Sequence, residues 1–217
     1  MGAPRTKVPY RERAVVRLPA IGNDVVDLAD PGIVRHHENR RFVERVCSEN
    51  ERARVTTARD LWSLFAAKEA AYKALVKVGG EPGFGHRSIE VASDFGSVIW
   101  RDLRLDLSIT GDLDHVHAVA WTEGARPLVR IMRTTDAQQG ESEGARALLR
   151  ELLSTALGCR PEAIEVIRDP SPGSWDGYGP PRVLRNGGPV DVDVSLSHDG
   201  LFVAAAAVLG RGSRSGA

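Results

Sequence analysis

Cysteine is scarce in this chain of 217 residues, and long apolar runs are missing altogether. The two cysteines, Cys47 and Cys159, lie far apart and outside any metal-binding spacing, which excludes a disulfide framework and favours a reducing compartment. No apolar run approaches the roughly 20 residues of a membrane span, and no signal-peptide pattern opens the chain. We therefore expect a cytoplasmic protein that has no membrane partner.

An excess of charge of either sign is also missing. The 29 acidic residues balance the 29 lysines and arginines, so the formal net charge is zero. A protein with balanced charge has no overall electrostatic attraction for nucleic acid or for an anionic lipid surface. We expect neither of these partners.

Lysine is rare as well. Only four of the 29 basic residues are lysines, and three of them, Lys68, Lys73 and Lys77, fall in the segment KEAAYKALVK. Lysine offers a compact, flexible cation suited to a phosphate or to proton transfer, whereas arginine offers a planar fork. The cluster indicates a site that needs ammonium groups. The alternative is chance combined with the good helix propensity of lysine.

These lysines lie on a predicted amphipathic helix at 60–77, where apolar residues recur at the three-and-four spacing of a helix. The apolar stripe should continue through positions 68 and 69, but Lys68 and Glu69 stand there. Burying such charges without partners costs several kcal/mol, so a partner, a metal or a bound anion is expected. The alternative is a solvated ion pair between Glu69 and Lys73, which are four residues apart.

A polar segment at 134–144 has no apolar periodicity and divides the chain into two predicted lobes, at 14–133 and 145–209. Each lobe carries both helix and strand patterns. The first has a capping-box pattern at Ser48 and Glu51 before the long helix, and alternating strands after it. The second has the helix ARALLRELLSTALG and a hairpin in which VDVDVSLS and LFVAAAAVL flank an Asp-Gly turn. The sequence predicts an α+β fold of two similar-sized lobes packed together.

Two further segments carry chemistry. In IGNDVVDL, a predicted strand, Asp24 shares a face with Gly22 and with apolar residues, so its carboxylate needs a cation or hydrogen-bond donors. Asp27 points the other way and is interpreted as solvated. In SLSHDG, Ser197 and His198 end a strand at a tight turn. A single histidine at a turn is more often a surface residue than a functional one, so its interpretation depends on the other segments.

In this order, IGNDVVDL, FAAKEAAYKAL and SLSHDG together resemble the 4'-phosphopantetheinyl transferase superfamily. The resemblance covers most of residues 20–77 and 147–209. It implies transfer of 4'-phosphopantetheine from coenzyme A to a serine of an apo acyl, peptidyl or polyketide carrier protein, with release of adenosine 3',5'-bisphosphate. The small acyl carrier protein synthases have this segment order, but the extra helix and the YGPP segment resemble the two-lobed members. We therefore expect a pseudo-dimer of permuted halves that acts as a monomer.

The resemblance also implies roles for single residues. Asp24 and Glu69 match the family's Mg²⁺ ligands, and the expected base is Glu69 or a metal-bound water that Glu69 orients. Lys68 and Lys73 match lysines that contact the phosphates. The residues expected to bind the nucleotide part of coenzyme A are Ser197, His198, Tyr178 and Gly179. At two positions the chain departs from the family pattern: Val26 stands where many two-lobed members have a third acid, and Pro180 replaces a lysine.

Two other functions remain open on the sequence. Val26 and Pro180 favour a module that binds coenzyme A or a carrier protein without catalysis. A metal-dependent phosphohydrolase would use the same acids but pass phosphate to water. His115 and His117 share a face of a predicted strand, but a third zinc ligand is not apparent in the sequence.

Overall fold

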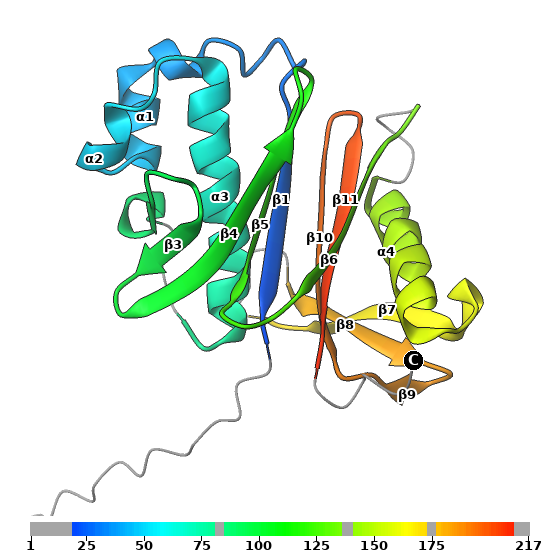
Figure 1. The fold of residues 1–217 in the computed structure, drawn as a ribbon. Coiled ribbons are helices and arrows are strands. Elements are labelled where there is room, and N and C mark those ends of the chain that lie inside the picture. Colours follow the sequence, from blue (N-terminus) through cyan, green and yellow to red (C-terminus); the bar gives the residue numbers. More distant parts are fainter. Residues whose placement is uncertain (1–18, 81–84, 136–140, 173–176, 211–217) are drawn as a thin grey trace, which may run out of the picture.

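The computed structural model describes residues 19–80, 85–135, 141–172 and 177–210, which form an α+β fold (Figure 1). Helix α3 (Ala58–Lys77) packs on a five-stranded sheet, and helix α4 (Glu141–Leu157) packs on a three-stranded sheet. The two sheets lie between the two helices. The α+β class expected from the sequence is therefore confirmed. Among the described residues, no helix is both long enough and apolar enough to cross a membrane.

The strands of the five-stranded sheet lie in the order β1-β5-β4-β3-β2, and all neighbours are antiparallel. Their bounds are β1 (Ile21–Asp27), β2 (Glu90–Val91), β3 (Ser97–Trp100), β4 (Leu103–Gly111) and β5 (His115–Thr122). Short helices precede α3 or follow it, namely η1 (His36–Glu38), α1 (Arg40–Val46), α2 (Glu49–Arg52) and η2 (His86–Ser88). Strand β1 is an edge of this sheet, and α3 packs directly on it.

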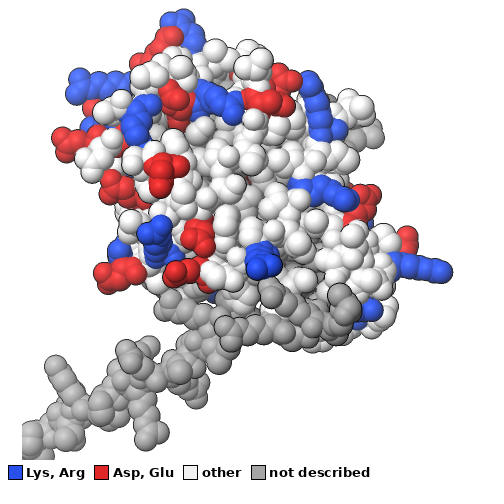
Figure 2. All heavy atoms as spheres, viewed as in Figure 1, with Lys and Arg blue, Asp and Glu red and all other residues white. Residues whose placement is uncertain are grey.

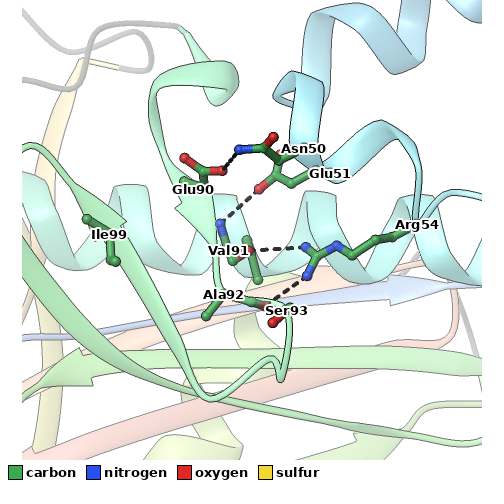
Figure 3. A pocket seen from close by; sticks show the side chains of 8 residues that line it. All are labelled: Asn50, Glu51, Arg54, Glu90, Val91, Ala92, Ser93 and Ile99. Atoms are coloured by element: carbon green, nitrogen blue, oxygen red, sulfur yellow. Dashed lines mark hydrogen bonds between the residues drawn. The ribbon is translucent and has the colours of Figure 1, made fainter.

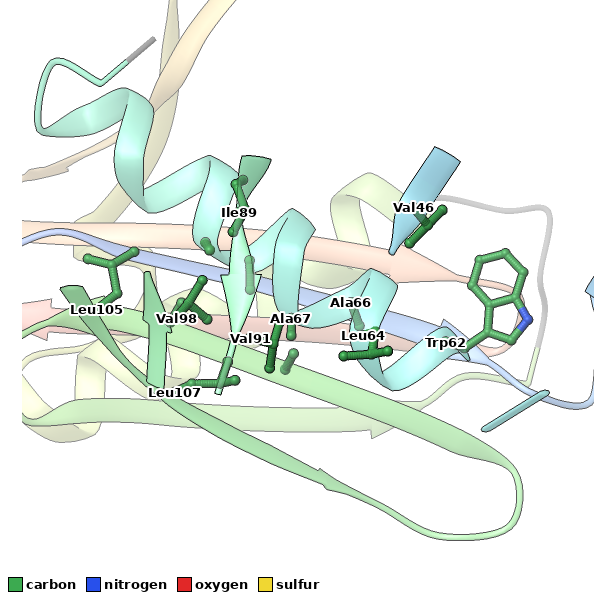
Figure 4. Close-up of a cluster of buried hydrophobic side chains, with 14 of the residues drawn as sticks. Val46, Trp62, Leu64, Ala66, Ala67, Ile89, Val91, Val98, Leu105 and Leu107 are labelled. Carbon is green, nitrogen blue, oxygen red and sulfur yellow. The ribbon is translucent and has the colours of Figure 1, made fainter. Parts of the chain in front are cut away.

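Helix α3 begins two residues before the predicted start because Thr57 and Asp60 form a capping box there. Its apolar side buries Leu64 and Ala67 against the sheet residues Val91 and Leu107 (Figure 4). The helix ends at Lys77, and Gly79 follows in a left-handed conformation with φ +81°. The predicted end at the two glycines is confirmed.

The three-stranded sheet has the order β10-β11-β6, with bounds β6 (Pro127–Arg133), β10 (Val192–Asp199) and β11 (Phe202–Leu209). Strand β11 is buried on both faces. Its Val203, Ala205 and Ala207 pack in the core beside α4, whereas Ala204 and Ala206 belong to the clusters shared with β1. Small alanine side chains let the two sheets approach closely.

Strand β6 corrects the predicted division of the chain. Residues 127–133 were expected in the first lobe, but β6 pairs with β11 in the three-stranded sheet. The chain therefore passes from one sheet to the other at 123–126, before the polar segment, of which 136–140 lie outside the described residues. A third, small sheet has the order β7-β8-β9, with bounds β7 (Ile164–Pro170), β8 (Tyr178–Arg185) and β9 (Gly188–Pro189), and η3 (Pro161–Ala163) precedes it.

Side chains of β10 cover the open edge of β1. Three backbone N–H groups of β1 donate to side-chain oxygens of β10, and each acceptor lies 172 residues after its donor. The pairs are Ile21 with Asp193 at 2.7 Å, Asn23 with Ser195 at 2.9 Å, and Asp27 with Asp199 at 2.8 Å. Because the offset is constant, β1 and β10 run parallel at this contact. We call it the β1–β10 contact.

Gly22 allows α3 to lie against β1. A Cβ atom at this position would stand 1.9 Å from the Ala70 carbonyl oxygen and 2.8 Å from the Ala74 amide nitrogen. Both are helix backbone atoms, so no side-chain movement could relieve the clash. The missing side chain brings the strand and the helix into backbone contact, and Asp24, two residues further along β1, faces the helix and contacts Lys73.

Candidate functional site

Asp24 and Lys73 form the centre of the candidate site. The Lys73 ammonium donates to Asp24 Oδ1 at 2.8 Å and to the Asn23 carbonyl oxygen at 2.9 Å. The two side chains are 16% and 31% exposed, so the pair is partly open to solvent rather than sealed inside the core. Burial raises the pKa of Asp24, Lys73 opposes this, and the negative charges of Glu69 and Asp199 add to the rise.

Glu69 lies beside this pair and is held by a histidine that the sequence analysis did not single out. His86 Nε2 lies 2.5 Å from Glu69 Oε1. Burial raises the pKa of Glu69, but the hydrogen bond and charge of His86 and the charge of Lys73 outweigh it, so the pKa is below the ordinary value. The structure therefore brings together three predicted residues, Asp24, Glu69 and Lys73, with opposite pKa shifts on the two acids.

The two carboxylates suit a hard divalent cation. In the described part of the chain, one oxygen of each accepts a hydrogen bond, from Lys73 and from His86, while Asp24 Oδ2 and Glu69 Oε2 have no protein donor. Mg²⁺ takes one or two carboxylates and completes its shell with waters and substrate phosphate oxygens. The described residues contain no group of three or more His, Cys, Asp or Glu side chains that could hold a metal. The residues present fit Mg²⁺ with two protein ligands.

Lys68 does not fit the expected contact with phosphate. Its side chain is fully buried, and its ammonium donates to Glu51 Oε2 at 2.5 Å, to the Val46 carbonyl at 3.0 Å and to the His86 carbonyl at 3.1 Å. An ammonium has three N–H donors, so all three are used inside the protein. Burial lowers the pKa of Lys68 and the charge of Glu51 opposes this. The interruption of the apolar stripe at 68 is explained by a buried partner, Glu51, and not by a ligand.

Lys77 shows the same use of an ammonium group. It donates to the Ile21 carbonyl at 2.7 Å, to the Val194 carbonyl at 2.6 Å and to Asp193 Oδ2 at 3.0 Å. It therefore joins α3, β1 and β10 at one point. A compact ammonium can reach acceptors in three directions, which a planar guanidinium cannot do. Two lysines of the cluster, Lys68 and Lys77, hold parts of the fold together, and only Lys73 lies in the candidate site.

Asp27 also differs from its expected role. It was interpreted as solvated, but it is buried, and its carboxylate accepts from the Leu201 and Ala29 amides, both at 2.9 Å. Gly200 in the β10–β11 turn has φ +51°, and a Cβ there would lie 2.2 Å from Asp27 Oδ2. The Asp-Gly turn predicted from the sequence is confirmed, and Asp27 fixes it against β1.

Ser197 and His198 end β10 as predicted, but they point to opposite faces of the strand. Ser197 is buried and accepts from Asn23 Nδ2 at 3.1 Å, whereas His198 is exposed. The next residue, Asp199, is near enough to raise the pKa of Asp24. The end of β10 is thus close to the candidate site, while the Ser197 hydroxyl lies in the interior between the sheets.

Tyr178 and Gly179 begin β8, which contacts β10. Arg168 donates to the carbonyl oxygens of both, at 3.3 Å and 2.8 Å. Figure 1 shows the small sheet at the end of the molecule opposite the β10–β11 turn, so these residues and the end of β10 lie at different ends of that strand. Arg182, in β8, pairs with Asp169 on the surface.

Behind Asp24, on the inner face of β1, lies a buried polar group that the sequence analysis missed. Asn23 is fully buried, and its Nδ2 donates to His117 Nε2 at 3.2 Å as well as to Ser197. Burial, with the charges of His115 and Lys73, lowers the pKa of His117 from 6.5 to about 3. His117 is therefore a neutral hydrogen-bond acceptor between β5, β1 and β10, which leaves the zinc interpretation without support.

This pKa predicts acid sensitivity. Between pH 6.5 and about 3 the unfolded chain binds a proton at His117 that the folded chain does not, so stability falls as pH falls, by up to about 1.4 kcal/mol per pH unit. His117→Gln is expected to remove that part of the slope. Urea unfolding at pH 7 and about 4.5 measures it. His37→Gln, at a surface histidine, is the control and should keep the wild-type slope; equal slopes in all three proteins would contradict the prediction.

A hollow of about 300 Å³ lies away from these residues, at α2, β2 and β3 (Figure 3). Its lining includes Glu51, Arg54 and Glu90, and none of the predicted site residues. Glu51 accepts from the Val91 amide at 2.8 Å, and Arg54 donates to the carbonyls of Val91 and Ala92. The polar groups in this hollow are thus largely engaged in holding β2 against α2.

On the face drawn in Figure 2, acidic and basic residues are interspersed, mostly toward the rim, around an uncharged centre. This agrees with the zero net charge of the chain. No large basic area of the kind that binds nucleic acid is visible on that face.

Comparison with known proteins relates this geometry to a family. The family model described as the 4'-phosphopantetheinyl transferase superfamily matches residues 20–126. The solved holo-acyl-carrier-protein synthase of Neisseria meningitidis is similar at 24% identity and a TM-score of 0.38, over 48% of this chain and 97% of that one. The synthase of Thermotoga maritima is similar at 18% identity and a TM-score of 0.34, over 78% of this chain and 84% of that one. The curated proteins gave no match.

Through residues 20–126, which hold the strand of Asp24 and the helix of Glu69, the chain belongs to the 4'-phosphopantetheinyl transferase superfamily. The resemblance inferred from IGNDVVDL and FAAKEAAYKAL is confirmed. The SLSHDG segment lies beyond the matched residues, so the permuted, two-lobed arrangement stays a prediction.

Proposed function

We propose that the protein transfers 4'-phosphopantetheine from coenzyme A to a serine of an apo carrier protein, in an Mg²⁺-dependent reaction. The observation that carries the proposal is that Asp24, Glu69 and Lys73 lie close enough to interact, although they come from a strand and a helix that are distant in the sequence. Asp24 and Glu69 would hold the ion, and bound Mg²⁺ would offset negative charge on the pyrophosphate. Membership of the superfamily supports coenzyme A and a carrier protein as the two substrates.

In the proposed reaction, the carrier serine oxygen bonds to the β-phosphorus of coenzyme A, and the bond from that phosphorus to the bridging pyrophosphate oxygen breaks. Adenosine 3',5'-bisphosphate leaves with the bond's electron pair. The serine proton passes to Glu69, whose carboxylate is ionised near neutral pH because its pKa is below the ordinary value. Products carry the same atoms as the two substrates.

Lys73 is the lysine that this mechanism uses. Its ammonium has three donors, and two of them are occupied by Asp24 and the Asn23 carbonyl. Among the described residues the third donor has no protein acceptor, so it can meet a phosphate oxygen, and the side chain is 31% exposed. Lys68 has no donor left, so we assign it a structural role instead.

For the nucleotide part of coenzyme A we propose His198, which is exposed near the end of β10. The expected adenine contact of Tyr178 and Gly179 is left out of the proposal, because their sheet lies at the opposite end of that strand. The buried hydroxyl of Ser197 supports a role in holding Asn23 rather than direct contact with a ligand. We further propose that the two sheet-and-helix halves act as a pseudo-dimer within one chain and that the protein works as a monomer, because β10 already covers the edge of β1.

A second candidate function is a module that binds coenzyme A or a carrier protein without catalysis. The specific observation in its favour is that Val26 stands two residues after Asp24, where many two-lobed members have a third acid, so the ion would have two protein ligands. Such a module would bind coenzyme A equally well when Glu69 is neutralised, and it would not modify a carrier.

The test is incubation with coenzyme A, Mg²⁺ and a panel of apo acyl, peptidyl and polyketide carriers, followed by intact-mass measurement. At least one carrier is expected to gain the mass of phosphopantetheine. Glu69→Gln should slow the gain by about 100-fold or more, the scale of losing a main electrostatic contact in a transition state. Glu162→Gln, at an exposed glutamate in η3, is the matched control and should keep the wild-type rate.

Three outcomes would count against the proposal. An entire panel of unmodified carriers would favour the binding module, if coenzyme A still raises the melting temperature. Free phosphopantetheine formed without a carrier would indicate a phosphohydrolase. Wild-type rates in Glu69→Gln would remove Glu69 from the mechanism.

A further inference from the structure

His86 stands between an aromatic ring and the Glu69 carboxylate. Its ring stacks on Phe65, with centroids 5.1 Å apart and planes 23° from parallel, while its Nε2 lies 2.5 Å from Glu69 Oε1. Phe65 and Glu69 are four residues apart on α3, so they lie on one side of the helix, one turn apart. The stacking fixes the plane of the imidazole, and the hydrogen bond fixes one oxygen of the carboxylate.

The backbone of His86 is held by Lys68, the residue that precedes Glu69 on α3. Lys68 donates to the His86 carbonyl at 3.1 Å while its charge is paired with Glu51 inside the core. Two neighbouring residues of α3 therefore bind one histidine: Lys68 donates to the His86 carbonyl oxygen, and Glu69 contacts the His86 ring. This explains why a fully buried lysine stands at position 68: it anchors the 3-10 turn of η2 beside α3.

We propose that His86 is a positioning residue that holds the Glu69 carboxylate in the orientation required to bind the metal ion. The inference rests on the proposed function, since it assigns Glu69 to the ion. The contact occupies Oε1 and leaves Oε2 without a protein donor among the described residues. A carboxylate that can rotate freely loses entropy when it binds an ion, whereas one held by a neighbour has already lost it. Removal of such outer partners typically weakens metal binding about 10- to 100-fold.

The side chain of His86 is accessible to this test. It is 25% exposed and is not part of the hydrophobic core that α3 shares with the five-stranded sheet, so a change of side chain leaves that core intact. His86→Phe keeps a flat ring for Phe65 but removes the donor. His86→Gln restores an N–H donor near the position of Nε2 without the ring. His37→Gln is the control at a histidine of η1 whose ring contacts the Val34 carbonyl.

Mn²⁺ alone, titrated into each full-length protein and followed by electron paramagnetic resonance, gives the dissociation constant without any enzymatic readout. His86→Phe is expected to weaken Mn²⁺ binding by about 10-fold or more. His86→Gln should recover most of that loss, and His37→Gln should match the wild type. Melting temperatures measured without metal show whether a variant has lost structure instead. The positioning role would be overturned if both His86 variants lost affinity equally and their melting temperatures dropped to match.

The proposal and the proposed function fail in different ways. If the wild type binds Mn²⁺, Glu69→Gln does not, and His86→Phe binds as the wild type does, the positioning role is wrong while the metal site stands. If neither the wild type nor Glu69→Gln binds Mn²⁺, the metal site itself fails, and the role of His86 falls with it.

Discussion

Replacing Lys68 by methionine is expected to lower the free energy of unfolding by about 3–5 kcal/mol, the scale seen when one partner of a buried ion pair is removed. The side chains of Lys68 and Glu51 are 0% and 1% exposed. Methionine has a similar length and volume, so little packing is lost. The cost arises because the Glu51 carboxylate stays in the core with only the Ser48 and Val91 amides as donors. Urea unfolding measures the change.

A double variant separates the lost charge from other effects. In Glu51→Gln with Lys68→Met, no unpaired charge is left inside, so more than half of the lost stability should return. Lys73→Met removes a lysine from the same helix at a partly exposed position, and we expect a loss of only about 1 kcal/mol. A single Lys68→Met variant as stable as Lys73→Met would show that the buried pair is not a stabilising feature.

Gly22→Ala is the second change with a large expected effect, and it acts on the fold and on the site together. The new methyl group would lie 1.9 Å from one backbone atom of α3 and 2.8 Å from another, so the strand and the helix must separate. Overpacking of this kind costs about 1–3 kcal/mol, and more where backbone has to move. We expect at least about 3 kcal/mol by urea unfolding, because both clashing partners are backbone.

The same separation should weaken the site. Moving α3 away from β1 lengthens the contact of Lys73 with Asp24 and draws Glu69 away from Asp24, so Mn²⁺ binding and carrier modification should fall even at temperatures where the variant is folded. Gly188→Ala is the control, because a Cβ there meets its nearest atom at an ordinary 3.6 Å. If Gly22→Ala binds Mn²⁺ as the wild type does, the close approach of strand and helix does not govern the site.

The sequence predicted the local elements well. Periodicity identified α3 and several strands, among them β1, β5, β10 and β11, because the side-chain spacing of a helix or a strand follows directly from its backbone geometry. The face of β1 that carries Gly22 and Asp24 was also predicted, and so was the approach of Asp24 to α3. Each of these inferences needs only the sequence of one helix or strand, or a family pattern that links two of them.

The partners of buried charges could not be predicted in the same way. Periodicity shows that position 68 is buried, but it does not show that Glu51, from a short helix earlier in the chain, lies across from it. The burial of Asp27 could not be predicted for the same reason. Its carboxylate accepts from the Leu201 amide in the β10–β11 turn, which is 174 residues away. Residues 127–133 were expected in the first lobe, but they form β6 and pair with β11, because the sequence of a strand gives no signal of which neighbour it pairs with.

The β1–β10 contact has a consequence for assembly. An edge strand normally offers a row of unpaired N–H groups that invites a strand from another molecule. On β1 three such groups are already engaged by aspartate and serine side chains of β10, which satisfy the donors but cannot extend the ladder to a further strand. The five-stranded sheet is therefore sealed on that side from within its own chain. A chain that stopped after β5 would present the same edge bare and would need a second copy to shield it.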